Sequence, residues 1–214
     1  MCGIVGYVGE KSAQDVVIEG LRRLEYRGYD SAGIALVLDG ALLTDKRAGK
    51  LANLEKALAE RPLAESTTGI GHTRWATHGP PTDRNAHPHL GRRDRVAVVH
   101  NGIIENFAQL RLELETEGVE MRSDTDTETA AHLLERELAS GVDLTVAMQR
   151  VCQRLQGAFT LVAVDAEDPS RVVAARRNSP LVVGLGDGEN FLGSDVAAFI
   201  EHTRDALELG QDQV

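Results

Sequence analysis

The chain has 214 residues, and its 23 basic and 33 acidic side chains give a formal net charge of −10 at pH 7. This length suits one globular domain with a full hydrophobic core, and 42% hydrophobic with 26% charged residues is ordinary for a folded soluble protein. The acidic balance argues against nucleic acid or an anionic membrane surface as a partner, and no apolar run approaches the roughly 20 residues needed to span a bilayer.

The first 60 residues predict a strand, a helix, a hairpin and a second helix. Residues 4–8 are rich in strand-forming side chains. Ser12, with Asp15 three positions later, resembles a capping box at the start of a helix. The Asp39-Gly40 pair between two apolar runs predicts a two-residue hairpin turn. Apolar residues at helical spacing then predict a helix over 50–59.

The rest of the chain predicts further strands and helices in clusters. Residues 96–99 form a short buried-strand pattern, and the following Asn101-Gly102 pair predicts a second hairpin. The remaining predicted elements are helices over 107–117, 127–139 and 144–155, the first two ending at Gly118 and Gly141, and strands over 159–164, 172–175, 181–185 and 191–192. Strand clusters separated by helix pairs favour a layered α+β fold.

Cys2 stands out because of its position. If Met1 is removed during maturation, Cys2 carries both a thiol and a free α-amine. A free α-amine titrates at about 7.7–8.0 and a thiol at about 8.5, so the amine can accept the thiol proton. The alternative is that Cys2 is a small packing residue at the start of a strand, as most free cysteines are. Cys152 lies in an apolar helical stretch and is expected in the core.

The histidines and cysteines form no recognisable metal-ligand pattern. Neither HExxH nor a Cys/His spacing is present, and no GxxxxGK[ST] phosphate loop occurs. Two cysteines so far apart do not make a disulfide framework. We therefore expect no metal, no cofactor and a reducing, cytoplasmic location.

Three segments carry polar groups suited to substrate binding. Asn101-Gly102 can present a side-chain amide and a backbone N–H to an oxyanion, although this pair is also a common turn. Arg74, in the segment 71–79, has a guanidinium fork suited to a carboxylate. The acidic segment 123–128 either caps the following helix or supplies a carboxylate, such as Asp126, to a substrate ammonium. An arginine and an aspartate used in this way describe an α-amino-acid pocket.

Seven motifs together resemble the glutaminase domain of the isomerizing glutamine–fructose-6-phosphate aminotransferases, also called glucosamine-6-phosphate synthases. They are MCGIVGYVG, LRRLEYRGYDSAG (21–33), GHTRWATHG (71–79), NAHPH (85–89), VVHNGIIEN (98–106), SDTDTE (123–128) and NSPLVVGLGDGENFLGSD (178–195). The resemblance covers essentially the whole chain. It implies a class II glutamine amidotransferase with the α+β fold of N-terminal-nucleophile hydrolases, a four-layer αββα sandwich with two mainly antiparallel sheets.

The resemblance implies L-glutamine as substrate and a γ-glutamyl thioester on Cys2 as intermediate, without metal or cofactor. It makes Cys2 the nucleophile, its α-amine the base, and Asn101 with Gly102 the oxyanion hole. The substrate-binding residues that it implies are Arg74 for the α-carboxylate, Asp126 for the α-ammonium, and Trp75, Thr77 and His78 along the pocket. Trp75 is expected on a mobile loop that gates ammonia passage.

The same resemblance implies a single glutaminase domain over 1–214, with the C-terminal sugar isomerase domains absent. In the full-length enzyme these domains use the ammonia to convert fructose 6-phosphate into glucosamine 6-phosphate, in amino-sugar biosynthesis. We expect a monomer or weak dimer for this chain and a homodimer for the full-length enzyme. The alternatives are the glutaminase domain of an amidophosphoribosyltransferase, or a non-catalytic amino-acid sensor. The RGYDSAG and HTRWATHG segments favour the aminotransferase, and an intact catalytic set argues against the sensor.

An uncleavable N-terminal tag should abolish glutaminase activity, because it turns the α-amine of Cys2 into an amide without a basic lone pair. The measurement is release of glutamate and ammonia from L-glutamine by the tagged chain. The same tag at the C-terminus is the control and should leave activity intact. Full activity of an N-terminally tagged chain, shown to be intact by mass spectrometry, would contradict the role of the amine.

Overall fold

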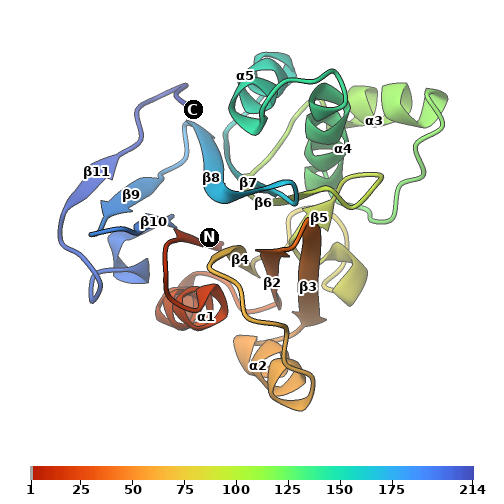
Figure 1. Ribbon diagram of the computed structural model, residues 1–214. Helices are drawn as coiled ribbons and strands as arrows, with labels where there is room; N and C mark the ends of the chain where they lie inside the picture. Colours follow the sequence, from red (N-terminus) through yellow and green to blue (C-terminus); the bar gives the residue numbers. More distant parts are fainter. Residues whose placement is uncertain (1) are drawn as a thin grey trace.

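A seven-stranded antiparallel sheet forms one half of the molecule in the computed structural model, which describes residues 2–214 (Figure 1). Its strands, in the spatial order β11-β9-β10-β1-β4-β2-β3, are β1 (Gly3–Val8), β2 (Ser31–Leu38), β3 (Ala41–Ala48), β4 (Thr68–Arg74), β9 (Val182–Leu185), β10 (Asn190–Gly193) and β11 (Ala206–Glu208). The first strand therefore lies in the middle of the sheet, between β10 and β4. This placement brings Cys2 to the end of a central strand.

A second, four-stranded antiparallel sheet packs against the first. It has the order β5-β6-β7-β8, with β5 (His89–Leu90), β6 (Val96–Gly102), β7 (Phe159–Asp165) and β8 (Asp168–Arg177). Alternate residues of β6 point to opposite faces: Ala97 and Val99 belong to the core between the sheets, and Val96 and Val98 to the core under the helices. Because both faces are buried, this strand reads as a continuous apolar run.

Helices cover the outer faces of both sheets. The helices α1 (Ala13–Leu24) and α2 (Leu51–Glu60) share an apolar core with the seven-stranded sheet, and α3 (Phe107–Thr116), α4 (Thr127–Leu138) and α5 (Leu144–Arg154) share one with the other sheet. Short 3₁₀ turns occupy Glu25–Arg27, Asp83–Asn85 and Val196–Ala198. The predicted αββα sandwich is confirmed, and Figure 1 shows α1 and α2 on the side opposite α4 and α5.

Several local predictions are confirmed. The Ser12 side chain accepts a hydrogen bond from the Asp15 backbone N–H at 3.3 Å and so caps α1. Asp39 and Gly40 both adopt positive φ, 49° and 78°, in the turn between β2 and β3. This is the conformation that a tight two-residue hairpin requires.

The predicted hairpin at Asn101-Gly102 is wrong. Strand β6 continues through both residues and pairs with β7, where Gly102 lies opposite Phe159. Gly102 has φ +122°, and a Cβ there would lie 2.1 Å from the Ala158 carbonyl oxygen. After Gly102 the chain stays beside the segment that leads into β7, since the Ile103 N–H donates to Ala158 O at 2.9 Å. It then enters α3 without turning back. Pairing with a distant strand therefore overrides the local turn signal.

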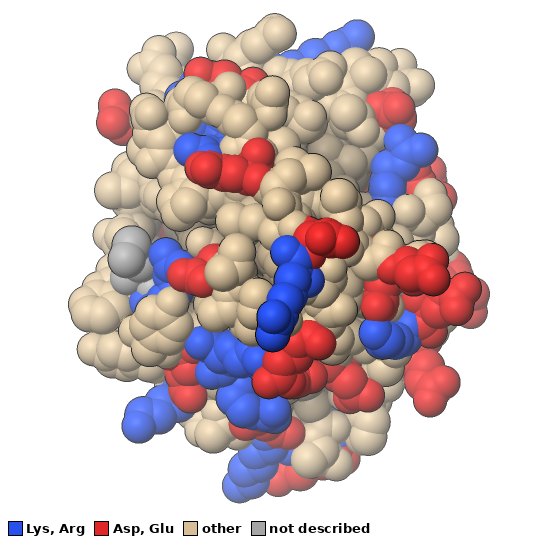
Figure 2. Space-filling model, turned by 90° about the vertical axis from the view of Figure 1, so that its left-hand side faces the viewer, with Lys and Arg blue, Asp and Glu red and all other residues tan. Residues whose placement is uncertain are grey.

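The surface carries charges of both signs. On the face drawn in Figure 2, basic side chains lie beside acidic ones, and no broad basic area is visible on it. This distribution agrees with the acidic composition. Within residues 2–214, no helix has the length and apolarity that crossing a membrane requires.

Close packing of α1 on the sheet gives a stability prediction. A Cβ at Gly71 of β4 would lie 2.4 Å from Val17 Cγ1 and 2.9 Å from Leu21 Cδ1, both on α1. Gly71→Ala should therefore push the helix outward and cost about 1–3 kcal/mol, which lowers Tm by about 3–9 °C for a domain of this size. Thermal unfolding followed by circular dichroism measures the shift. The control Ala41→Val, at an exposed strand position, should leave Tm unchanged, and an equal Tm for both variants would contradict this packing argument.

Candidate active site

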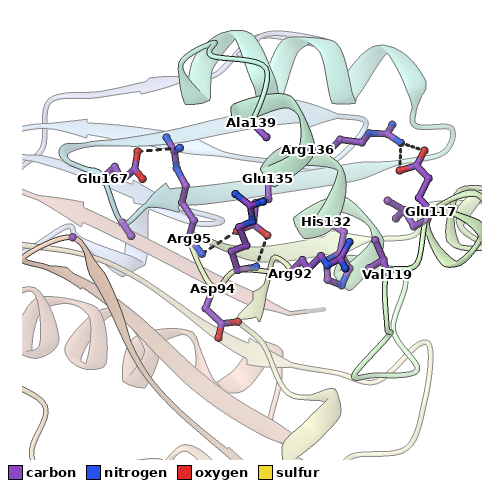
Figure 3. Close-up of a pocket in the computed structure, with 14 residues that line it drawn as sticks. Arg92, Asp94, Arg95, Glu117, Val119, His132, Glu135, Arg136, Ala139 and Glu167 are labelled. Carbon is purple, nitrogen blue, oxygen red and sulfur yellow. Dashed lines mark hydrogen bonds and ion pairs between the residues drawn. The ribbon is translucent and has the colours of Figure 1, made fainter.

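Two cavities differ sharply in the chemistry of their walls. The first, of about 390 Å³, lies beside α4 and the turn before β6 (Figure 3). Two of its four arginines pair with carboxylates: Arg95 with Glu167 at 2.9 Å, and Arg136 with Glu117 at 2.9 Å. The Glu135 carboxylate accepts hydrogen bonds from turn backbone N–H groups. No cysteine or hydroxyl side chain lines this cavity among the described residues, so it offers no thiol or hydroxyl nucleophile.

The second cavity, of about 310 Å³, brings together the predicted residues. It lies where the ends of β4 and β6 meet the start of β1 and of α4. The predicted residues that line it are Cys2, Arg74, Trp75, Thr77, Asn101, Gly102 and Asp126. His78 does not line it: the imidazole packs edge-on against the Phe107 ring, with centroids 4.9 Å apart. The chemistry of this cavity makes it the candidate active site.

The Cys2 thiol is held by the loop that follows β4. The Trp75 backbone N–H donates to Cys2 Sγ at 3.2 Å, and Sγ lies 3.6 Å from the Trp75 carbonyl oxygen. Burial raises the pKa of the Cys2 thiol, while the hydrogen bond from Trp75 and the charge of Arg74 lower it without offsetting the burial. The resting thiol is therefore protonated at neutral pH and needs a base. The predicted base depends on Met1, which lies outside the described residues.

Asn101 is the last residue but one of β6, and its side chain lies beside Cys2. Its Nδ2 donates to the Cys2 carbonyl oxygen at 3.2 Å, and its Oδ1 lies 3.0 Å from His72 Nε2. Gly102 follows directly and also lines the cavity. A side-chain amide and the adjacent main chain are thus presented on the same side of the cavity as the thiol. This arrangement can stabilise an oxyanion formed by attack of sulfur on a carbonyl.

Arg74 organises the loop over the thiol. Its guanidinium donates to the carbonyl oxygens of His78, Gly79 (3.2 Å) and Pro80 (3.4 Å), so the loop curls around it. The predicted carboxylate fork is therefore already engaged by loop carbonyls, although Arg74 still lines the cavity. Arg74 thus has a structural role that the sequence did not indicate.

The side chain of Trp75 packs against Tyr29. The two rings meet edge-to-face with centroids 5.3 Å apart, and Trp75 is 50% exposed. Next along the loop, the Ala76 backbone N–H donates to the Asp30 carboxylate. Segments 26–31 and 74–79 therefore form one rim of the cavity.

Asp126 does not cap α4. It occupies the N-cap position with helical φ and ψ, but its side chain accepts no capping hydrogen bond. Its Oδ2 instead accepts from the Ile104 backbone N–H at 2.9 Å, and its Oδ1 lies 3.8 Å from His100 Nδ1. The capping interpretation is wrong for this residue. The carboxylate is buried at the cavity and is bonded to the segment that follows Gly102.

A buried histidine cluster at the floor was missed as part of the site. His87 Nε2 and His100 Nδ1 both contact Thr127 Oγ1, at 2.8 and 2.9 Å, and all three residues line the cavity. Burial lowers the pKa of both histidines, which keeps them neutral. Within residues 2–214, no cluster of histidine, cysteine or carboxylate side chains is arranged to hold a metal ion. From the sequence the histidines were considered only as metal ligands, and that interpretation was rejected; their shared contact with Thr127 could not be foreseen, because Thr127 is distant in the chain.

Comparisons with known proteins agree with this geometry. The family model described as a glutamine amidotransferase domain matches residues 72–201. The chain is 70% identical over 214 residues to a glutamine–fructose-6-phosphate aminotransferase (isomerizing) from Streptomyces coelicolor, and 64% identical over 218 residues to one from Mycobacterium tuberculosis. Each match covers 100% of this chain and 35% of the relative, so the chain spans about a third of the length of these curated relatives.

Two solved structures share the fold. A glutamine phosphoribosylpyrophosphate amidotransferase from B. subtilis, complexed with ADP and GMP, matches with a TM-score of 0.82 at 26% identity, over 98% of this chain and 46% of that chain. A structure described as the allosteric regulatory enzyme of purine biosynthesis matches with a TM-score of 0.84 at 28% identity, over 98% and 45% of the two chains. The predicted N-terminal-nucleophile hydrolase fold is confirmed.

Arg74→Lys should raise KM for L-glutamine about 10- to 100-fold, because an ammonium can neither form the bidentate contact with a carboxylate nor hold the loop carbonyls. Steady-state kinetics of glutamate release measures this change. Arg92→Lys, at an exposed arginine of the other cavity, is the matched control and should leave KM unchanged. An unaltered KM in Arg74→Lys would place the carboxylate site elsewhere.

Proposed function

Because the chain belongs to the glutamine amidotransferase family, we propose that its Cys2 cavity hydrolyses L-glutamine to glutamate and ammonia. One observation carries the proposal. The Cys2 thiol, the Asn101 amide and the Arg74 guanidinium, which are far apart in sequence, line a single cavity of about 310 Å³. A volume in this range suits a small substrate such as a single amino acid.

The reaction begins with attack of Cys2 sulfur on the side-chain amide carbon of glutamine. The α-amine of Cys2, freed by removal of Met1, takes the thiol proton as the C–S bond forms. The Asn101 amide and the Gly102 N–H stabilise the resulting oxyanion. The protonated amine then passes its proton to the departing nitrogen, the C–N bond breaks and ammonia leaves. A γ-glutamyl thioester remains on Cys2.

Water completes the cycle. The α-amine removes a proton from water as the oxygen attacks the thioester carbonyl, and the same donors hold the second oxyanion. The C–S bond breaks, sulfur recovers a proton, and glutamate is released. The raised pKa of the Cys2 thiol supports the need for an adjacent base, since few thiolates form spontaneously at neutral pH.

Charged groups at the cavity support an α-amino-acid substrate. We assign the substrate α-carboxylate to Arg74, which the loop carbonyls already orient, and the α-ammonium to the buried Asp126 carboxylate. Trp75 and Thr77 flank the substrate as lining residues of the cavity, and Trp75 gates the exit for ammonia. His78 contributes through its carbonyl contact with Arg74 rather than through its imidazole.

The whole protein is proposed to use this ammonia in amino-sugar synthesis. Residues 1–214 form the glutaminase domain, and sugar isomerase domains missing from this chain convert fructose 6-phosphate into glucosamine 6-phosphate. Relatives that carry the aminotransferase name are 60–70% identical, against 26% for the phosphoribosylpyrophosphate amidotransferase, which supports the former over the latter. The full-length enzyme is proposed to be a cytoplasmic homodimer, and this chain a monomer or weak dimer.

Cys2→Ala should abolish release of glutamate and ammonia while L-glutamine still binds, as measured by calorimetry, because the binding groups are unchanged. Cys152→Ala is the matched control and should keep activity, since that thiol packs against the helical core and burial raises its pKa to about 12. A Cys2→Ala chain that still hydrolyses glutamine would overturn the nucleophile assignment. A wild-type chain that binds glutamine without releasing ammonia would indicate a sensor.

A further inference from the structure

We propose that His72 is a positioning residue that sets the orientation of the Asn101 amide, and through it the oxyanion hole. The inference rests on the proposed glutaminase function and extends it to a residue that does not touch the substrate. His72 lies in the middle of β4, is 1% exposed, and does not line the cavity. Its hydrogen-bond contact with the site is the one to Asn101.

The carboxamide of Asn101 has two possible orientations of similar shape, and only one supports catalysis. With Nδ2 toward Cys2, the amide donates to the Cys2 carbonyl at 3.2 Å and can donate to an oxyanion formed on the adjacent sulfur adduct. If the amide is flipped, its oxygen faces both the Cys2 carbonyl and the developing negative charge. That arrangement replaces an attraction by a repulsion, so one donor of the hole is lost.

His72 selects the productive orientation through its protonation state. Burial lowers the pKa of His72 to about 3, so the ring is neutral at physiological pH and carries one N–H. Nε2 lies 3.0 Å from Asn101 Oδ1, which can only accept a hydrogen bond, and the His100 backbone also contacts the ring. Because an amide oxygen cannot donate, the contact with Asn101 places the proton on Nε2. The Nε2–H group donates to the Asn101 oxygen. It could not donate to the amide nitrogen, which is itself a donor.

The surroundings keep the ring neutral and fixed. The His87 ring lies against His72 with centroids 4.2 Å apart, and the charge of Arg74 also disfavours a protonated imidazole. On its strand, His72 pairs with Ile4 of β1 and Gly33 of β2, so its backbone is held from both sides. The bond to Asn101 thus joins the centre of one sheet to the end of β6 in the other.

The experiment compares two substitutions at His72. His72→Phe keeps the ring and removes the donor, and it should lower kcat for glutamate release about 10- to 100-fold with KM changed by less than about threefold. His72→Gln places an amide N–H near the position of Nε2 and should restore kcat to within about threefold of the wild type. His202→Phe is the matched control and should not change kcat. The His202 ring stacks on Phe191, with centroids 5.0 Å apart, and does not line the cavity.

A double-mutant cycle separates positioning from a general structural effect. Asn101→Ala should lower kcat about 10²–10³-fold, and adding His72→Phe should cost nothing further, because the group that His72 orients is gone. Multiplicative losses in the double variant, or a His72→Gln chain as slow as His72→Phe, would overturn the proposal. Thermal unfolding of each variant identifies any that fail to fold.

A second readout does not depend on turnover. Nitrogen-15 NMR of the imidazole should show His72 with its proton on Nε2 from pH 5 to pH 9, and the shift of that proton should move in Asn101→Ala. A proton on Nδ1 would overturn the proposal even if the chain is active. A wild-type chain that releases no ammonia would refute the proposed function, and the NMR result would still decide the orientation of Asn101.

Discussion

The position of β1 between β10 and β4 is the constraint on which the site depends. A central strand cannot shift without breaking ladders on both sides, so Cys2, at its beginning, is fixed relative to the rest of the sheet. The second sheet then meets this point through Asn101, which donates to the Cys2 carbonyl and approaches His72. The Cys2 thiol is therefore located by sheet pairing, and Asn101 is brought to it by contact between the two sheets.

Burial determines the electrostatics of the cavity. It raises the pKa of the Cys2 thiol and lowers that of the histidines beneath it, so both kinds of group are neutral in the resting state. The neutral histidines still make hydrogen bonds, such as those that join His87 and His100 to Thr127, and they add no charge to the cavity. The charged residues that line the cavity are Arg27, which pairs with Asp195 at 3.0 Å, and Arg74 and Asp126, whose opposite charges suit a zwitterionic amino acid. The thiol still requires a proton acceptor. The proposed acceptor is the α-amine of Cys2 itself, which would be free once Met1 is removed.

Much of the fold was predictable, because local signals agree with the final structure. The capped helix after Ser12 and the Asp39-Gly40 hairpin depend on neighbouring residues alone. The hairpin at Asn101-Gly102 was predicted wrongly because β7, which pairs there, lies far along the chain. The site residues were recognised through family motifs, whereas the engaged fork of Arg74 and the hydrogen bonds of Asp126 were not predictable. The first depends on how the loop after β4 folds back on Arg74, and the second on how the start of α4 packs against the segment after β6.

The most direct test of the central claim is to quench the wild-type chain with acid during turnover of L-glutamine and measure its intact mass. The account predicts loss of Met1 and a fraction of molecules that carries one γ-glutamyl group on Cys2, located by peptide mapping. Substrate turnover by a chain that retains Met1, or a glutamyl group on any other residue, would contradict it.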